Sequence, residues 1–364
     1  MSLDLVTAGE SHGPALVAIL TGVPAGLRLE RAAIDADLAR RREGYGRSPR
    51  QKLEADEVEV LAGLRHGVTL GTPLALLIRN RDHENWAWGM SAWPPAGEPS
   101  GKGTQPVTLP RPGHADLAGA QKYGHDDVRN ALERASARQT ASQVAAGAVA
   151  KALLVEIGVS VEGRVLEIGG ATDDEAMQAA TDEARADRDT LGGVVEVVAN
   201  GVPPGLGSYA EKRTRLDGRL AAALMGIQAV KGVEIGDGFA LARRRGSGAH
   251  DEIEPDRTRG SNRAGGVEAG VSNGEPVVVR AAMKPLPTLM RPLGSVDLAT
   301  GEPGQALVER SDVQAVEALA VVAEAAVAWE LARAAREKFG GDALQDFVAA
   351  HGAYLARIDP QPKP

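Results

Sequence analysis

The sequence VQAVEALAVVAEAAVAWELARAA, residues 313–335, is apolar on nearly every side of the helix that it predicts. A helix at a protein surface keeps a polar face, so a helix without one is expected to be buried on both sides. A second long helix is predicted over about residues 136–157, where apolar side chains follow the i, i+3, i+4 spacing. We therefore expect a layer of helices that is covered by β-sheets.

Short apolar stretches bounded by turn residues predict the strands of those sheets. They lie at about residues 3–8, 15–21, 58–61, 74–78 and 277–281, and a further helix is predicted at 32–42. We expect the sheets to be antiparallel and to lie outside the helices. The predicted fold class is therefore α+β, a β-α-β sandwich with a helical layer between antiparallel sheets, formed by the whole chain as one domain.

The second half of the chain repeats the first in four places, in the same order. The matched pairs are 22–26 with 201–205, 67–73 with 270–276, 113–118 with 294–299 and 132–135 with 308–311. We expect two similar sheet-plus-helix halves, at about residues 1–157 and 190–338, related by an approximate two-fold axis. The halves differ at chemical positions, since His114 is matched by Ser295, so each half would contribute different groups to one composite site.

The composition is that of a soluble globular protein and disfavours several classes of function. Hydrophobic residues make up 43% of the chain and charged residues 25%. With 3% aromatic residues and a net charge of −8, a nucleic-acid-binding protein is not expected. The chain has no cysteine, which removes disulfides and cysteine metal sites, and no metal site is predicted. The N-terminus does not resemble a secretory signal and no apolar run is long enough for a membrane span, so we expect a cytoplasmic protein.

Residues 110–143 combine two histidines and four arginines with glycine turns. The bend at Pro112–Gly113 is expected to hold His114 next to Asp116. Ser136 is a predicted N-cap of the alanine-rich helix that follows, and free backbone N–H groups at a helix start attract anions. This stretch therefore predicts an anion-binding site.

A second cationic stretch, residues 40–52, holds six basic residues and one acid. Its glycines allow the arginines to converge on a phosphate or a carboxylate. A solvated charged surface is the alternative interpretation, which the residues themselves leave open. Residues 84–109 predict a long loop or flap with three tryptophans, residues 172–190 a peripheral helix, and residues 243–251 and 256–266 polar loops that close over a ligand.

Six stretches, taken together and in order, resemble the chorismate synthase family. They are AGESHG (8–13), RPGHAD (111–116), RASAR (134–138), GVEIGDGF (232–239), KPLPT (284–288) and ERSD (309–312), and they span almost the whole chain. The resemblance implies a carbon–oxygen lyase of the shikimate pathway of aromatic amino acid biosynthesis. Its reaction would be the anti 1,4-elimination of phosphate from 5-enolpyruvylshikimate 3-phosphate to give chorismate.

The resemblance also implies a cofactor and partners. Reduced FMN (FMNH2) would be needed although the reaction has no net redox change. Because no reductase domain is appended to this chain, a separate flavin-reducing system linked to NADP would supply it. A homotetramer is implied as well.

Roles for individual residues follow from the same resemblance. His114 resembles the acid beside the leaving phosphate, His12 the group that protonates or stabilises reduced flavin, and Asp312 the carboxylate that works with the flavin in hydrogen removal. The substrate or the flavin phosphate would be held by Arg41, Arg47, Arg111, Arg134 and Arg310. The flavin would lie along Arg134, Ala135, Ser136, Gln228, Ala229, Ala269, Lys284, Pro285, Leu286, Pro287, Thr288 and Arg310.

The chain departs from the family pattern at two of these positions. The family commonly has a second serine where Ala135 stands and a glycine where Ala269 stands. Either change would alter flavin affinity without removing the fold.

Two other functions are alternatives to the lyase. The first is a flavin oxidoreductase that uses the same arginines for a nicotinamide phosphate, which the lack of a G-x-G-x-x-G turn between a strand and a helix disfavours. The second is a non-enzymatic scaffold for anions or nucleic acid, supported only by the basic residues at 40–52 and 243–245.

Overall fold

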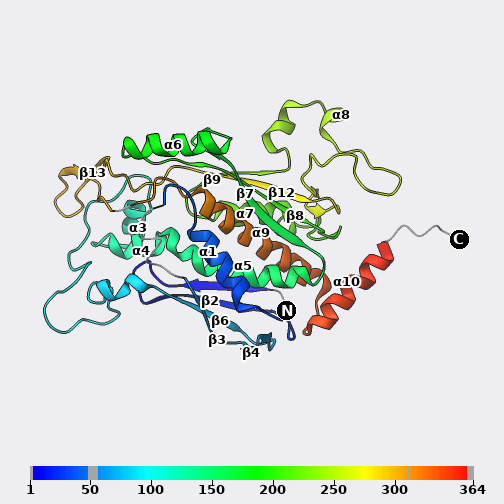
Figure 1. Cartoon of the computed structure of the whole chain (residues 1–364), viewed down its shortest axis with the longest axis horizontal. Coiled ribbons are helices and arrows are strands. Elements are labelled where there is room, and N and C mark those ends of the chain that lie inside the picture. Colours follow the sequence, from blue (N-terminus) through cyan, green and yellow to red (C-terminus); the bar gives the residue numbers. More distant parts are fainter. Residues whose placement is uncertain (1–2, 48–55, 310, 359–364) are drawn as a thin grey trace.

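The computed structural model describes residues 3–47, 56–309 and 311–358, and two four-stranded antiparallel sheets enclose a layer of helices within it (Figure 1). The first sheet has the strand order β1-β2-β6-β3, with β1 Asp4–Ala8, β2 Ala15–Thr21, β3 Val58–Ala62 and β6 Leu74–Arg79. The second has the order β7-β8-β12-β9, with β7 Ser160–Ile168, β8 Gly193–Asn200, β9 Val230–Ile235 and β12 Val277–Met283. The helices between them are α1 Arg31–Arg42, α5 Thr140–Val155, α7 Leu216–Met225 and α9 Val316–Phe339. The predicted sandwich is therefore confirmed.

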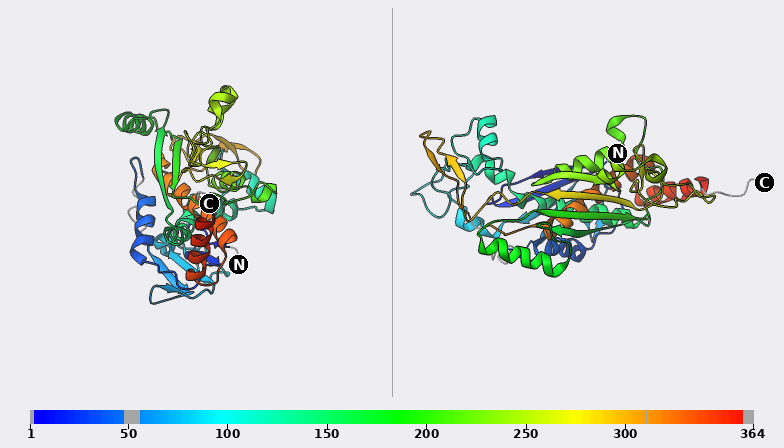
Figure 2. Two further views of the ribbon diagram at one scale, coloured as in Figure 1. Left: turned by 90° about the vertical axis from the view of Figure 1, so that its right-hand side faces the viewer. Right: turned by 90° about the horizontal axis from the view of Figure 1, so that it is seen from above.

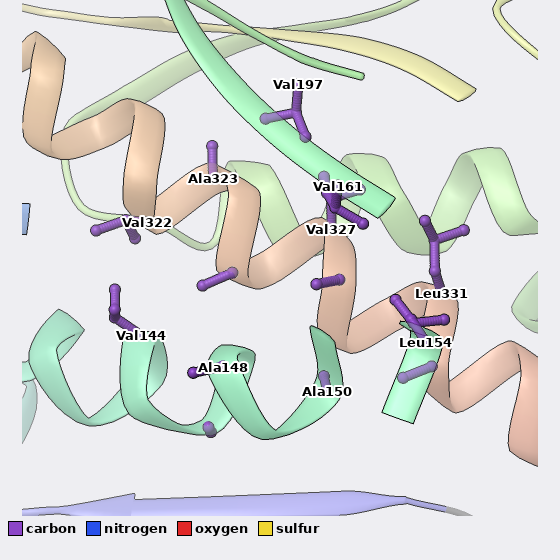
Figure 3. Close-up of a cluster of buried hydrophobic side chains, with 14 of the residues drawn as sticks. Val144, Ala148, Ala150, Leu154, Val161, Val197, Val322, Ala323, Val327 and Leu331 are labelled. Carbon is purple, nitrogen blue, oxygen red and sulfur yellow. The ribbon is translucent and has the colours of Figure 1, made fainter. Parts of the chain in front are cut away.

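The helical layer contains most of the hydrophobic core. Figure 3 shows Val144 and Leu154 of α5 facing Val322 and Val327 of α9, with Val161 of the second sheet beside them. A Cβ atom added at Gly147 of α5 would lie 2.3 Å from Cβ of Ala325 in α9, so the two helices pack at the closest distance that their backbones allow. The alanine-rich sequence of α5 and α9 explains this packing, because small side chains let two helices approach closely.

The two halves share one order of elements. The elements of the sandwich run strand, strand, helix, strand, strand, helix in each half, with the helix α6, Asp174–Ala186, inserted between the first two strands of the second half. Each sheet places its fourth strand between the second and the third. The matches 22–26 and 201–205 each join the second strand to the helix, and 67–73 and 270–276 each precede the last strand. The match of 113–118 with 294–299 does not extend to local structure, because the first leads into α3 and the second begins with β13.

The repeat bounds of about 1–157 and 190–338 stay a prediction. The first strand of the second sheet is β7, at Ser160–Ile168, and it takes the position that β1 has in the first sheet. We propose on this basis that the second repeat starts at β7 rather than near residue 190.

The remaining elements lie around this sandwich. The helix α6, Asp174–Ala186, is peripheral as expected, and α10, Leu344–Ile358, lies at the opposite end from α3, Asp116–Tyr123, and α4, Arg129–Ala135 (Figures 1 and 2). The long loop predicted at 84–109 is confirmed from residue 87 onward, because residues 87–115 form no helix or strand, whereas residues 84–86 belong to η1, Arg81–Trp86. The shorter elements are η1 Arg81–Trp86, η2 Ala137–Gln139, η3 Lys212–Thr214, η4 Gly238–Arg243, α8 Gly246–Ala249 and the two-stranded pairs β4 Leu64–Arg65 with β5 Val68–Thr69, β10 Val267–Glu268 with β11 Val271–Ser272, and β13 Gly294–Val296 with β14 Pro303–Gln305. In the described part of the chain, no helix combines the length and the apolar character that a membrane span requires.

Candidate functional site

A cavity of about 530 Å³ lies where the two halves meet. Its walls come from the loop after β1, the end of α1, the loop at 111–115, η2, the α7–β9 connection, the loop after β12 and the chain before α9. Segments that are more than 200 residues apart in the chain therefore face one another across it. Fourteen of the sequence-predicted site residues line this cavity: His12, Arg41, Arg47, Arg111, His114, Ala135, Ser136, Gln228, Ala229, Lys284, Leu286, Pro287, Thr288 and Asp312.

His12 is buried and is held on several sides. Its Nδ1 lies 2.8 Å from Oε1 of Glu133, and its backbone N–H donates to Oε2 of the same carboxylate at 2.8 Å. The imidazole stacks on the indole of Trp86 with 4.0 Å between ring centroids and 20° between planes. His83 donates from its Nδ1 to the His12 carbonyl oxygen at 2.9 Å. Although burial raises the pKa of Glu133, the hydrogen bonds from His12 lower it below its usual value.

His114 lies in a similar arrangement on the other side of the site. Its Nδ1 contacts Oδ1 of Asp116, a fully buried carboxylate. Arg111 binds Asp116 through its backbone N–H at 3.0 Å and through Nε at 2.9 Å. Burial raises the pKa of Asp116, but the hydrogen bonds from His114 and Arg111 outweigh burial and hold the pKa well below its usual range. The bend at Pro112–Gly113 thus produces the predicted histidine–carboxylate pair.

Three further guanidinium groups form a second cationic wall. Arg138 donates to Oδ1 of the buried Asp56 at 2.6 Å, and Arg41 lies 3.7 Å from Oδ2 of the same residue. Arg47 pairs with Asp312 at 3.1 Å. Burial lowers the pKa of Arg41 to about 9, against the opposing attraction of Asp56, and the charges of Arg138 and Arg47 add to the fall. Such crowded positive charge favours the binding of an anion.

The rest of the cavity is largely apolar, with two amines at its rim. Lys284 donates to the carbonyl oxygen of Gly113, and burial lowers the pKa of Lys284, with the charge of Lys231 adding to the effect. Oε1 of Gln228 is buried and has no hydrogen-bond partner among the described residues. The apolar lining includes Leu132, Met225, Ile227, Ala315, Ala318, Leu319 and Val322.

Three of the predicted site residues that the structure describes are not brought to the cavity: Arg134, Ala269 and Pro285. Arg134 instead donates to the carbonyl oxygens of Thr7 and Gly9, at 2.9 and 3.0 Å, and so supports the turn that carries His12. Ala269 lies in the β10–β11 turn with φ of 51°, and Pro285 is not part of the walls. Arg310 lies outside the described residues.

The predicted helix cap at Ser136 also differs in the structure, and the first backbone N–H group of α9 is bound by Gln314. Ser136 accepts from the backbone N–H of Arg138 at 3.2 Å and caps η2, because a 3-10 turn precedes α5. The first backbone N–H group of α9, that of Val316, donates to Oε1 of Gln314 at 2.6 Å. Asp312 therefore faces Arg47 rather than capping α9.

Several residues around the site are absent from the set that the sequence predicts. Arg138 stands in the quoted RASAR stretch, so its charge was a usable signal. Lys231 stands directly before the quoted GVEIGDGF stretch. For Asp56, Trp86 and Glu133 the sequence carries no comparable signal, because only the tertiary structure brings them to the cavity residues.

Comparisons with known proteins agree with this geometry. The family model described as chorismate synthase matches residues 3–335. The chain is 53% identical over 386 residues to a chorismate synthase of Desulforudis audaxviator, covering 98% of both chains. It is 54% identical over 385 residues to one of Rubrobacter xylanophilus, again covering 98% of both.

A solved structure is similar as well. A crystal structure of chorismate synthase is similar over 99% of both chains, with a TM-score of 0.79 and 38% sequence identity. The chain therefore belongs to the chorismate synthase family and is a carbon–oxygen lyase acting on phosphates in the shikimate pathway.

Proposed function

We propose that the chain converts 5-enolpyruvylshikimate 3-phosphate to chorismate and phosphate by anti 1,4-elimination, with reduced FMN as cofactor and without net redox change. The observation that carries the proposal is the composition of the cavity, which joins a wall of arginines and two histidine–carboxylate pairs to an apolar wall. The substrate carries a phosphate and two carboxylates, so it needs several cations at once. The ring of a flavin needs an apolar surface.

The arginines suit the substrate. Arg41, Arg47 and Arg111 line the cavity, and each is braced by a carboxylate: Asp56, Asp312 and Asp116 respectively. A braced guanidinium loses little conformational entropy when it binds an anion, and its fork of N–H donors matches a phosphate or a carboxylate. These groups would hold the substrate and stabilise the charge on the departing phosphate.

The other wall fits reduced FMN. The buried, unpartnered Oε1 of Gln228 offers an acceptor for an N–H group of the ring, and Leu319 and Val322 offer apolar surface. Lys284 and Lys231 offer positive charge for the FMN phosphate. When bound, reduced FMN supplies electron density that assists cleavage of the carbon–oxygen bond.

The two histidines would act as general acid–base groups. Nε2 of His114 would give a proton to the departing phosphate, and Nε2 of His12 would keep the reduced cofactor in the protonation state that the reaction needs. Asp312, paired with Arg47, would act with the cofactor in removal of the ring hydrogen. The family assignment also leads us to propose a homotetramer in the cytoplasm that is served by a separate flavin-reducing system linked to NADP.

The test is an anaerobic incubation of the purified protein with 5-enolpyruvylshikimate 3-phosphate and chemically reduced FMN. Chorismate and phosphate should form in equal amounts, and neither should form with oxidised FMN. His12→Ala and His114→Ala should each slow turnover about 10²–10⁴-fold. The control His351→Ala, in α10 outside the cavity, should not. Wild-type turnover in both cavity variants would refute the proton roles, and steady consumption of NADPH without the substrate would favour an oxidoreductase.

A further inference from the structure

Each histidine of the cavity is bonded through the same ring nitrogen to a carboxylate that is completely shielded from solvent. Nδ1 of His12 lies 2.8 Å from Glu133, whose side chain is 0% exposed. Nδ1 of His114 contacts Asp116, whose side chain is also 0% exposed. The two carboxylates come from different segments, because Glu133 lies in α4 and Asp116 begins α3. The same arrangement therefore occurs twice in one site.

The direction of these hydrogen bonds follows from the charge of the carboxylates. Both carboxylate pKa values are lowered, because the hydrogen bonds outweigh the effect of burial, so both groups are ionised near neutral pH. An ionised carboxylate can only accept a hydrogen bond. Nδ1 must therefore carry the proton in both histidines, and Nε2 is the nitrogen that gains or loses a proton. Among the described residues, no hydrogen bond reaches either Nε2.

We propose that Glu133 is a positioning residue for His12: it holds the imidazole in the Nδ1–H tautomer and keeps Nε2 available to the cavity. Asp116 does the same for His114. The inference rests on the proposed function for the role of Nε2, but not for the tautomer itself. A carboxylate behind a histidine is a general way to select one tautomer and one ring orientation.

Three contacts make the His12 arrangement rigid. The second oxygen of Glu133 accepts from the His12 backbone N–H at 2.8 Å, so the carboxylate fixes both the ring and the chain that carries it. The indole of Trp86 covers one face of the imidazole. Arg129 lies 4.9 Å from the centre of a Trp86 ring and 3.4 Å from Oε1 of Glu133, and so connects the two supporting groups.

Glu133 gives the cleaner test, because Asp116 also binds Arg111, which we place at the substrate. Glu133→Gln keeps the size of the side chain but replaces one acceptor oxygen by an –NH2 donor. Nδ1 of His12 lies 2.8 Å from Oε1 and 3.0 Å from Oε2 of Glu133, so this donor would lie within hydrogen-bond distance of Nδ1 in either orientation of the amide. We expect His12 to populate the Nε2–H tautomer as a result.

The first measurement needs neither substrate nor flavin. Histidine-selective ¹⁵N labelling and solid-state NMR near neutral pH distinguish protonated from unprotonated ring nitrogens, and His12→Gln assigns the signal among the seven histidines. The wild type should show Nδ1–H for His12, and Glu133→Gln should show a new Nε2–H population. An Nε2–H tautomer in the wild type would overturn the proposal, even if the variant failed to fold.

The second measurement is steady-state turnover. Glu133→Gln should lower kcat about 10²–10⁴-fold, the usual contribution of a general acid–base group, with KM for the substrate changed much less. Glu324→Gln is the control, because that carboxylate is equally buried and ion-paired but lies in the helical layer outside the cavity walls. It should leave the His12 tautomer and kcat as in the wild type. An active enzyme whose kcat and tautomer survive Glu133→Gln refutes the positioning role, whereas the expected tautomers in an inactive wild type would refute only the proposed function.

Discussion

The packing of α5 on α9 predicts that Gly147→Ala destabilises the protein although alanine favours helices. The added Cβ would lie 2.3 Å from Cβ and 2.6 Å from Cα of Ala325, whereas ordinary contact begins at about 3.4 Å. The helices would have to separate by about 1 Å at this point. They cannot do so freely, because the two sheets cover the helical layer on both sides.

The magnitude follows from two opposing effects. Overpacking of a well-packed core costs about 1–3 kcal/mol and sometimes more. The better helix propensity of alanine returns about 0.5–1 kcal/mol. We therefore expect a net loss of about 1–2 kcal/mol. With an unfolding entropy of about 2.1 cal/mol/K per residue, a chain of 364 residues shifts its Tm by about 1.3 °C for each kcal/mol.

The assay compares Gly147→Ala with Gly352→Ala at equal protein concentration, by differential scanning calorimetry and by urea denaturation. Gly352 is also in the interior of a helix, α10, but a Cβ added there meets nothing within 4 Å. The control should gain about 0.5–1 kcal/mol while Gly147→Ala loses stability. Equal stabilisation by both substitutions would refute the argument that α5 and α9 are in backbone contact.

Three further predictions concern separate parts of the molecule. Burial raises the pKa of Glu324, but hydrogen bonds from Arg40 and the charge of Lys151 outweigh it, so the net pKa is below 4.5; Glu324→Gln should therefore cost about 2–4 kcal/mol at pH 7. The ionised Glu324 stabilises the folded state above pH 4.5, and this stabilisation is lost as the pH falls through the lowered pKa of the folded state. The difference in unfolding free energy between Glu324→Gln and the wild type, measured by urea denaturation, should therefore shrink between pH 5 and pH 3. A difference that stays constant with pH would contradict this prediction. Lys284→Met should weaken FMN binding about tenfold, as measured by flavin fluorescence quenching. The affinity of the wild type for FMN should fall with rising pH as Lys284 loses its charge, and at a lower pH than an ordinary lysine would give, since the pKa of Lys284 is lowered. Lys231→Met removes a neighbouring positive charge and should move this fall to higher pH. The same pH dependence in the wild type and in Lys231→Met would rule out an effect of Lys231 on the pKa of Lys284. Ala269→Gly should raise the Tm by about 1 °C, because φ of 51° strains an alanine by about 1–2 kcal/mol. The greater conformational entropy of glycine in the unfolded chain offsets only part of this gain. A fall in Tm would show that the methyl group is needed for packing.

The sequence determined the layers of the fold and many of the polar residues of the cavity. Residues 313–335 lack a polar face, and a helix without a polar face has to be buried on both sides, so the central layer followed from local pattern alone. The stretches 111–116 and 284–288, which contribute several cavity residues, each carry a signal of their own in charge, glycine and proline. The matches between the halves also anticipated a composite site.

What the tertiary structure decided is which of these polar groups meet, and which do not. Arg134 and Arg138 stand four residues apart in one motif, yet Arg138 faces the cavity and Arg134 supports the β1–β2 turn. Local sequence gives no preference between them, because the direction of each side chain depends on how η2 and α4 pack on the first sheet. The same holds for Glu133. Its partner His12 is 121 residues away, and no sequence pattern within α4 indicates that this glutamate is buried and bonded to a histidine. Periodicity and turn chemistry act over a few residues, so they can be predicted from the sequence. A hydrogen bond between residues that are 121 positions apart forms only once the sheets and helices have packed.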